Sequence, residues 1–362
     1  MPFNSSFVSS KRYALKRNIL VVEDLKLSSF LVNGSKDEAF LIEDSHRSLY
    51  TSLFHLLKAP ISANDIYKQL RAQGIDIEES TVQHVLDDLV ENNIVEPYQG
   101  AYTGSVLTSR HLDKYSRQLY FIASLGFSMQ DALAAQEKLK AAHVAILGVG
   151  GVGGHIAYAL SAMGVGQLTL IDHDDIELSN TSRQVLYDET NIGKSKLDVA
   201  KEKLLQYNGD LDLHTFNKRV KCEEDLKYIL YNRNIDLFLL AADTPRGEIK
   251  YISDRVCQEC SIPFLFGAPS GNFVYFGPFI IPEKTKTLSQ LQSQQYVLSR
   301  ECESINAEFV ASIMEPYNAI AGNLVVLEAF RFLTGLEEPI SINRVKILNL
   351  STMSISSKSY DD

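Results

Sequence analysis

The chain has 362 residues, with 35 basic and 45 acidic side chains and a formal net charge of −10. At roughly 100–200 residues per domain, this length is typical of about two domains. A chain this acidic has no overall attraction for nucleic acid or anionic membranes, so neither is expected as a partner. Four cysteines are too few for a disulfide scaffold, and the N-terminus lacks the apolar core of a signal peptide. We therefore expect a cytoplasmic protein.

Residues 1–105 are predicted to form a small domain of their own. Short apolar runs separated by turn-forming residues predict strands at Ile19–Glu23, Phe30–Val32 and Ala39–Ile42. A helix is expected to follow from about Ser45 to Lys58 and to stop before Pro60.

Two more helices and a returning strand complete the predicted first domain. Ser62, with Asp65 three residues later, is expected to cap the second helix, which ends at Gly74. Ser80 is expected to cap the third helix, and Ile94–Pro97 to return as a strand. The apolar face of the third helix comprises Val82, Val85, Leu86 and Leu89. Three strands followed by three helices resemble a winged-helix module.

The charge of this module argues against the commonest use of a winged helix, which is DNA binding. Between Ile61 and Asn92 there are two basic and seven acidic residues, so phosphate would be repelled. β-Augmentation is the physical alternative, in which a peptide adds a strand to the sheet edge. A domain that only packs against the rest of the chain stays open as a third interpretation.

Residues 106–362 follow a polar linker, Gly100–Ser109, and are predicted to form an α/β domain. Strand-like segments there alternate with amphipathic segments of helical length, which is typical of a doubly wound, Rossmann-like parallel sheet. The expected strands are His143–Leu147, Gln167–Asp172, Leu211–Phe216, Ile235–Leu240 and Pro263–Gly267. Residues 283–308 are expected to form a long crossing loop, and Tyr317–Thr334 a buried helix closed by Gly335.

A glycine-rich turn follows the first of these strands. Gly148, Gly150, Gly151 and Gly153 stand between the strand HVAIL and the next helix. Such a turn lets the backbone approach a phosphate closely and points amides at it from a helix N-terminus. Asp172 lies 22 residues after Gly150, where a carboxylate can hold ribose hydroxyls. A nucleotide site is therefore predicted, against the alternative of a glycine-rich packing turn.

The residues after Asp172 distinguish between nucleotides. The glycine turn alone favours a dinucleotide and a dehydrogenase. The segment that follows, however, contains Asn180, Arg183 and Lys196. Cations such as the arginine and the lysine neutralise the charge of a triphosphate while its α-phosphorus is attacked. Asp243, after the strand DLFLLAA, stands where a carboxylate can hold Mg²⁺ against phosphate oxygens. The sequence therefore predicts ATP and Mg²⁺ as ligands.

Together these motifs resemble the ThiF/MoeB/HesA superfamily, which includes the activating enzymes of ubiquitin-like proteins. The resemblance runs from about residue 112 to residue 350 and rests on KYSRQ, GVGGVG, LIDHD, LSNTSRQ, IGKSK and SIMEPYNAIAGNLVVLEAFRFLTG. Members adenylate a carboxylate with Mg-ATP and release pyrophosphate. The resemblance therefore implies an ATP-dependent adenylyltransferase.

The resemblance also implies a role for each matching residue. Asp172 would bind the ribose and Asp243 the metal ion. The phosphate ligands would be Asn180, Arg183 and Lys196. Arg117, in KYSRQ, would match an arginine that reaches the ATP of the neighbouring subunit, which implies a homodimer with composite sites. Without the motif around it, Arg117 would be interpreted as half of a surface salt bridge.

Two departures from the family are visible in its cysteines. Many members hold a structural zinc with two CxxC pairs, whereas here only Cys257 and Cys260 have that spacing, so no zinc is expected. Members that pass the acyl group to a thiol carry a cysteine shortly before the helix near Met314, and here the nearest is Cys302. Cys302 is expected to have no role, which leaves a nucleophile of the substrate to intercept the acyl-adenylate.

A winged-helix module ahead of an adenylating domain resembles the branch that matures ribosomally made peptide natural products, the MccB-like and PaaA-like enzymes. In that branch the module binds the leader of the precursor peptide. MccB-like members activate a C-terminal asparagine, and PaaA-like members, favoured here by size and by the missing zinc cysteines, act on glutamate side chains. The predicted function is adenylation of a carboxylate in such a peptide, with capture of the acyl group within the peptide during antibiotic maturation.

Three other functions stay open from the sequence. The first is activation of the C-terminal glycine of a ubiquitin-like sulfur carrier. The second is a silent protein that recruits peptide for another enzyme, which the intact Arg117, Arg183, Lys196 and Asp243 oppose. The third is an NAD-dependent oxidoreductase, in which the cluster of cations would have no purpose.

Overall fold

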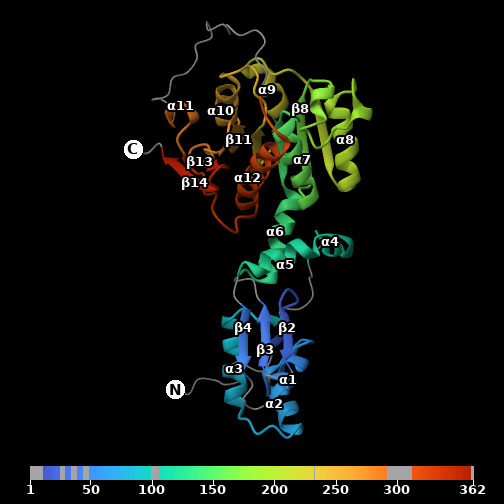
Figure 1. Cartoon of the computed structure of the whole chain (residues 1–362), viewed down its shortest axis with the longest axis vertical. Helices are drawn as coiled ribbons and strands as arrows, with labels where there is room; N and C mark the ends of the chain where they lie inside the picture. The colour runs from blue at the N-terminus through green and yellow to red at the C-terminus, as the bar shows by residue number, and fades with distance from the viewer. Residues whose placement is uncertain are drawn as a thin grey trace. The chain divides into compact units, whose positions relative to one another are not determined.

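A computed structural model of the chain describes residues 11–24, 29–33, 39–43, 49–98, 104, 106–231, 233–291 and 312–359. The chain divides into two compact units, Met1–Ala134 and Ala135–Asp362, with the division inside one helix (Figure 1). Half of the predicted linker, Gly100–Ser109, falls outside the described residues, and its last residue, Ser109, begins a helix. In the described part of the chain, no helix has the length and apolarity needed to span a bilayer.

The first unit contains two small antiparallel sheets. One, drawn as blue arrows in Figure 1, has the order β2 (Leu20–Asp24), β3 (Ser29–Asn33), β4 (Ala39–Glu43). The other has the order β5 (Ile61–Ser62), β1 (Arg12–Leu15), β6 (Val95–Tyr98). The four strands predicted in this unit are confirmed as β2, β3, β4 and β6. Sequence reasoning missed β1 and β5, which are too short to show an alternating pattern.

Three helices pack with these sheets around one apolar core. They are α1 (Leu49–Leu56), α2 (Ala63–Ala72) and α3 (Glu79–Glu91). Phe30 and Val32 of β3 are buried in this core against side chains of all three helices. The first turn of α2 is capped as predicted: the Ser62 hydroxyl accepts the Asp65 N–H at 3.1 Å.

The prediction that Ser80 caps α3 is wrong. The helix begins at Glu79, and the residue before it, Glu78, has the extended backbone of a cap but no side-chain capping bond. The Ser80 hydroxyl lies inside the first turn, 3.4 Å from Glu78 Oε2. The predicted apolar face of this helix is confirmed at Val82, Leu86 and Leu89, which are buried.

Three further helices follow along the chain: α4 (Ser109–Lys114), α5 (Ser116–Ser124) and α6 (Met129–Ala141). The second unit is then built on an eight-stranded sheet of order β14-β13-β12-β11-β10-β7-β8-β9. Its strands are β7 (His143–Leu147), β8 (Gln167–Asp172), β9 (Asp212–Asn217), β10 (Leu237–Leu240), β11 (Phe264–Ser270), β12 (Phe273–Phe276), β13 (Arg344–Asn349) and β14 (Ser354–Ser359). The five predicted strands are confirmed as β7 to β11, and they run parallel.

Helices cover both faces of the parallel strands, which confirms the predicted doubly wound α/β fold. The helices are α7 (Gly151–Met163), α8 (Lys196–Tyr207), α9 (Glu223–Leu230), α10 (Ile249–Glu259), α11 (Leu288–Leu291) and α12 (Glu315–Thr334). Alternate strand residues, such as Val144 and Ile146, pack against α7, α8 and α12. Their neighbours, such as Ala145 and Leu147, pack against α9 and α10. The central strands β7 and β10 are buried along their whole length because both of their faces are covered, whereas the edge strand β9 mixes polar and apolar residues and is partly exposed.

The strand order places β7 at the point where the winding of the sheet reverses. Along the parallel part the order is β9-β8-β7-β10-β11, so the first strand stands in the middle, with later strands added on both sides. In such sheets a ligand binds beyond the carboxyl ends of the strands at this reversal. The carboxyl ends of β7, β8 and β10 therefore define the place to look for a site.

The predicted buried helix is confirmed as α12. It starts two residues earlier than expected, at Glu315, and ends at Gly335, whose φ of +66° closes it in the left-handed conformation. Helix α12 packs against α7, and Gly322 makes this possible, because a Cβ there would lie 2.8 Å from His155 Cβ. Much of the predicted loop 283–308, including Cys302, falls outside the described residues.

Candidate nucleotide site

The glycine turn after β7 has a shape that its first glycine requires. Gly148 has a φ of +90°, and a Cβ there would lie 2.8 Å from backbone atoms of Ala241 and Ala242. The Gly148 N–H donates to the carbonyl oxygen of Ile171 at 2.8 Å. The turn is thus wedged between the carboxyl ends of β8 and β10, where a side chain has no room.

The remaining glycines lie at the N-terminus of α7, where two of them leave no room for a side chain. A Cβ on Gly153 would overlap the Gly148 carbonyl, and one on Gly151 would overlap the side-chain amide of Asn318. Gly150, which precedes the helix, is different, because a Cβ there would meet nothing closer than Gln184 Nε2 at 3.6 Å. No side chain caps this end of α7, so its first backbone amides suit a phosphate.

Val149, in the middle of the turn, is held through both its backbone polar groups. Its N–H donates to Asp172 Oδ2 at 2.7 Å, and its carbonyl oxygen accepts the Tyr187 hydroxyl at 2.8 Å. Burial raises the pKa of Tyr187 well above its ordinary value, and nearby Asp172 and Asp174 raise it further. The phenol therefore stays protonated and donating at any pH near neutrality.

The carboxylate of Asp172 is almost fully engaged with backbone. Besides Val149, it accepts the N–H of His173 at 2.7 Å and that of Asp174 at 2.9 Å, both on Oδ1. Asp172 is buried, with 7% of its surface exposed. A carboxylate offers about four lone-pair sites, so a further donor such as a ribose hydroxyl can still be accommodated.

Asp174 and Lys196 form an ion pair beside this turn. Lys196 Nζ lies 2.8 Å from Asp174 Oδ2, and 8% of the lysine side chain is exposed against 50% of the aspartate. Burial of Asp174 opposes its ionisation, but the hydrogen bond and charge of Lys196 outweigh burial and keep the pKa of Asp174 below its ordinary value. The first residue of α8 thus carries a buried, paired ammonium at the same edge of the sheet.

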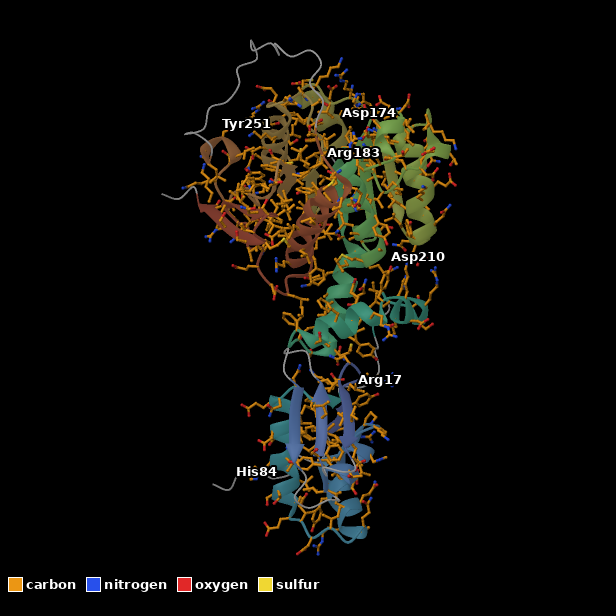
Figure 2. All side chains as sticks on the ribbon, viewed as in Figure 1. Arg17, His84, Asp174, Arg183, Asp210 and Tyr251 are labelled. Atoms are coloured by element: carbon orange, nitrogen blue, oxygen red, sulfur yellow. The ribbon has the colours of Figure 1, made fainter. Side chains whose placement is uncertain are left out.

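Asn180 and Arg183 lie in the segment between β8 and α8, which also contains Asp174; Figure 2 labels Asp174 and Arg183. Asn180 is buried, and its Oδ1 accepts the Glu177 N–H at 3.2 Å. The Arg183 guanidinium donates to the Ser179 carbonyl, and the Arg183 carbonyl accepts Asn318 Nδ2 from α12 at 3.2 Å. These bonds hold the segment in a compact series of turns.

Asp243 stands three residues beyond the end of β10. Its neighbours Ala241 and Ala242 lie against Gly148, and the Ala241 N–H donates to the Leu147 carbonyl at 2.8 Å. The Asp243 side chain is exposed and has no hydrogen bond or ion pair with any residue in the described ranges. A free carboxylate of this kind is the oxygen ligand that Mg²⁺ prefers.

The comparisons with known proteins now identify the chain. Residues 115–360 match the sequence pattern of the ThiF family. The chain belongs to the ThiF family. This confirms the resemblance inferred from the motifs, and the chain is an ATP-dependent adenylyltransferase.

Relatives of this ThiF-family chain support the same activity. The molybdopterin-synthase adenylyltransferase of Haemophilus influenzae is 33% identical over 220 residues, which are 60% of this chain and 82% of the relative. The structure of Escherichia coli MccB with ATP is 25% identical, covers 96% of this chain and 97% of its own, and has a TM-score of 0.74. PaaA is 22% identical at a TM-score of 0.74 and covers 95% of this chain and 99% of its own, which shows a shared fold.

Six of the predicted site regions of this ThiF-family chain lie in the second unit, at the carboxyl ends of β7, β8 and β10: the glycine turn, Asp172, Asn180, Arg183, Lys196 and Asp243. Arg117 lies in α5 of the first unit and is exposed, so its contact with a neighbouring subunit's ATP stays a prediction. Sequence reasoning did not single out Asp174, Tyr187 or Asn318. The second aspartate of LIDHD was a signal for Asp174, whereas nothing local to Tyr187 or Asn318 indicated their contacts.

The CxxC pair of this ThiF-family chain lies at the end of α10. Cys257 is buried in α10, and burial raises its pKa well above the ordinary value. Cys260 follows directly after the same helix.

Among the described residues, the one group that offers three possible metal ligands is Asp172, His173 and Asp174. Both Asp172 oxygens already accept backbone N–H groups, so this group serves to shape the turn.

Proposed function

We propose that this adenylyltransferase activates a carboxylate of a ribosomally made precursor peptide, which then captures the acyl group within itself during natural-product maturation. The observation that carries the proposal is the extent of the structural similarity. Escherichia coli MccB crystallised with the peptide derivative MccA-N7isoASN has a TM-score of 0.74 and covers 96% of this chain, which includes the first unit. The molybdopterin-synthase relative matches 60% of the chain.

The nucleotide site supports the first chemical step. The open N-terminus of α7 and the cations Arg183 and Lys196 would neutralise the triphosphate, with Asn180 as a further ligand and Asp172 on the ribose. A carboxylate oxygen of the peptide attacks the α-phosphorus, an acyl–phosphate bond forms, and pyrophosphate leaves with the negative charge that these groups stabilise. Asp243, exposed and unpaired among the described residues, would hold the Mg²⁺ that accompanies ATP.

Arg117 would complete the site from a second copy of the chain. Its guanidinium is exposed on α5, where a phosphate of a neighbouring subunit can reach it in a homodimer. An arginine can donate two parallel hydrogen bonds to phosphate oxygens. It can therefore stabilise a transition state whose negative charge is distributed over several of these oxygens. Two such sites per homodimer follow from two-fold symmetry.

The first unit would bind the leader segment of the peptide. In the sheet β2-β3-β4, β4 pairs with β3 on one side and with no other described strand on its outer side. An extended peptide can add to such an edge. Because the leader is then tethered to the enzyme, delivery of the reacting carboxylate becomes intramolecular and its own contacts can be weak.

The experiment is pyrophosphate release from Mg-ATP by the purified protein. The substrate to be tried is the product of any short reading frame that lies next to the gene, and the control is the same peptide without its leader. We expect release that needs the leader and disappears in Asp243→Ala, which removes an exposed side chain and should fold normally. Release that is equal with and without the leader would contradict the leader-binding role of the first unit.

A second candidate function is activation of the C-terminal glycine of a ubiquitin-like sulfur carrier, because relatives of this chain include the sulfur carrier protein ThiS adenylyltransferase of Escherichia coli, 29% identical over 237 residues. In the same assay a carrier protein ending in glycine would then support pyrophosphate release and the peptide would not. The two substrates therefore separate the two functions.

A further inference from the structure

Lys196 is held by a single aspartate. Its Nζ lies 2.8 Å from Asp174 Oδ2, and its backbone N–H donates to the Asp174 carbonyl at 3.1 Å. An isolated antiparallel bridge joins the neighbours Asp175 and Ser195. Both the backbone and the side chain of Lys196 are therefore tied to the turn that follows β8.

That turn also holds the glycine turn. Asp174 donates its N–H to Asp172 Oδ1 at 2.9 Å, and Asp172 Oδ2 accepts the Val149 N–H at 2.7 Å. A continuous series of hydrogen bonds thus runs from Val149 through Asp172 and Asp174 to Lys196. The series links the two phosphate-binding elements, the amides that open α7 and the ammonium that opens α8.

We infer that Asp174 is a positioning residue for Lys196, which it holds ready for the phosphates of the nucleotide. The inference rests on the proposed function of this site. Asp174 itself would be repelled by a triphosphate, so a benefit to nucleotide binding has to pass through the lysine. A buried ammonium without a counter-ion tends to lose its proton, and a free lysine side chain must be ordered when the ligand arrives. Asp174 provides the counter-ion and orders the lysine side chain before the nucleotide binds.

The other charged groups around Asp174 are compatible with this role. His173 Nε2 lies 3.4 Å from Asp174 Oδ1, on the oxygen that does not face Lys196. Arg219, beyond β9, is near enough to lower the pKa of Asp174, although its effect comes after those of Lys196 and His173. Lys196 is thus the main partner of the carboxylate, and the role can be tested through that pair.

A double-mutant cycle separates action through Lys196 from every other role of Asp174. Binding of the non-cleavable analogue α,β-methylene ATP is titrated in the wild type, Asp174→Asn, Lys196→Met and the double variant. We expect Asp174→Asn to weaken binding about tenfold, in the range of a lost charged hydrogen bond, and to have no effect in the Lys196→Met background. A tenfold loss in both backgrounds would overturn the inference, because Asp174 would then act without the lysine.

The chain provides a matched control on the same helix. Lys203 of α8 pairs with Asp188 at 2.8 Å, with 52% of the aspartate side chain exposed, much as in the Lys196 pair. Among the described residues Asp188 has no hydrogen bond to the glycine turn, and Asp188→Asn keeps a side-chain oxygen for the Thr190 N–H, so analogue binding should stay unchanged within about twofold. Asp174→Glu, which restores the charge on a longer arm, should recover part of the affinity lost in Asp174→Asn.

A second readout does not depend on the proposed function at all. Acetylation of lysines by acetic anhydride, followed by mass spectrometry of the nucleotide-free protein, reports how exposed and how basic each amine is. We expect Lys196 to react several-fold faster in Asp174→Asn, with Lys203 unchanged. An unchanged rate at Lys196 would overturn the inference. If the wild type binds no nucleotide, the proposed function fails. The acetylation rate of Lys196 still tests whether Asp174 holds the lysine.

Discussion

The hydroxyl of Tyr187 donates a hydrogen bond to the carbonyl oxygen of Val149 at 2.8 Å. Tyr187 is buried at 4% exposure, and Val149 is completely buried. The bond fixes the central residue of the glycine turn from the side opposite to Asp172, which takes the Val149 N–H. The turn therefore owes its shape to a tyrosine and an aspartate outside the glycine motif.

Tyr187→Phe should test this support. The substitution keeps the ring and leaves the Val149 carbonyl buried without a donor, so we expect a loss of about 1–3 kcal/mol in the free energy of unfolding and weaker nucleotide binding. Chemical denaturation and analogue titration measure the two effects. Tyr158→Phe is the control, since Tyr158 is 37% exposed and its ring packs on Tyr207. A loss of similar size in the control would count against the role of the Val149 bond.

Gly148→Ala should destabilise the protein for two reasons, an unfavourable φ and a clash with Ala241 and Ala242. Gly74 has a similar φ of +84° and no atom within 4 Å of a Cβ placed there, so Gly74→Ala isolates the first reason. We expect about 1 kcal/mol for Gly74→Ala and at least about 2 kcal/mol more for Gly148→Ala. Equal losses in thermal or chemical unfolding would show that the turn can move away from β10.

Glu328 should be the most sensitive acidic residue of α12. Its side chain is fully buried and accepts hydrogen bonds from Arg331 Nη1 at 2.7 Å and from the Ser341 N–H at 2.8 Å. Glu328→Ala leaves the Ser341 amide without its acceptor and removes the buried partner of Arg331, which keeps only its bond to the exposed Glu337, and we expect a loss of about 3–5 kcal/mol. Glu337→Ala removes the exposed partner of the same arginine, 3.1 Å away, and should change stability by less than about 1 kcal/mol. Chemical denaturation of both variants gives the comparison.

The pH dependence of stability should contain a contribution from Asp225. The hydrogen bond from Lys218, followed by that from the Lys221 N–H, lowers the pKa of Asp225 to about 2, below its ordinary value of 3.8. A carboxyl whose pKa is depressed on folding stabilises the protein above its unfolded pKa, and this stabilisation is lost as the pH falls through the folded pKa. The difference in unfolding free energy between the wild type and Asp225→Asn should therefore be constant above about pH 5 and shrink towards pH 2. A difference that does not vary with pH would contradict the assignment.

Arg117 can be tested by mixing two inactive variants. If each site takes Arg117 from one subunit and Asp243 from the other, Arg117→Ala and Asp243→Ala are both inactive alone. After unfolding and refolding together, half of the dimers are mixed and each of these has one complete site. Pyrophosphate release should then return to about a quarter of the wild-type rate. No recovery, in a mixture shown to contain mixed dimers, would place Arg117 and Asp243 of one subunit in the same site.

The pattern of the sequence predicted the parallel strands because most of them are apolar runs and segments of helical length separate them. β7 and β8 have the predicted bounds, and β9, β10 and β11 differ at their ends. The missed strands have other causes. β14 reads SISSKS, and residues 354–358 are all exposed, so no buried apolar face marks it in the sequence, and its strand character comes from pairing with β13. Ser80 has the right chemistry for a cap, but α3 starts at Glu79, two residues before the start that a cap at Ser80 implies. Sequence reasoning places helix ends only to within a few residues.

The sequence by itself determined the edge of the sheet at which the candidate nucleotide site lies. Glycines after β7, an aspartate that ends β8 and an aspartate after β10 are local features, and parallel strands bring their carboxyl ends together. Only the tertiary structure decided how these groups are held. Asn318 reaches the Arg183 carbonyl from 135 residues away, and Lys196 lies on Asp174 rather than free. Such contacts depend on how helices pack and where side chains then point, and no local pattern of residues encodes either.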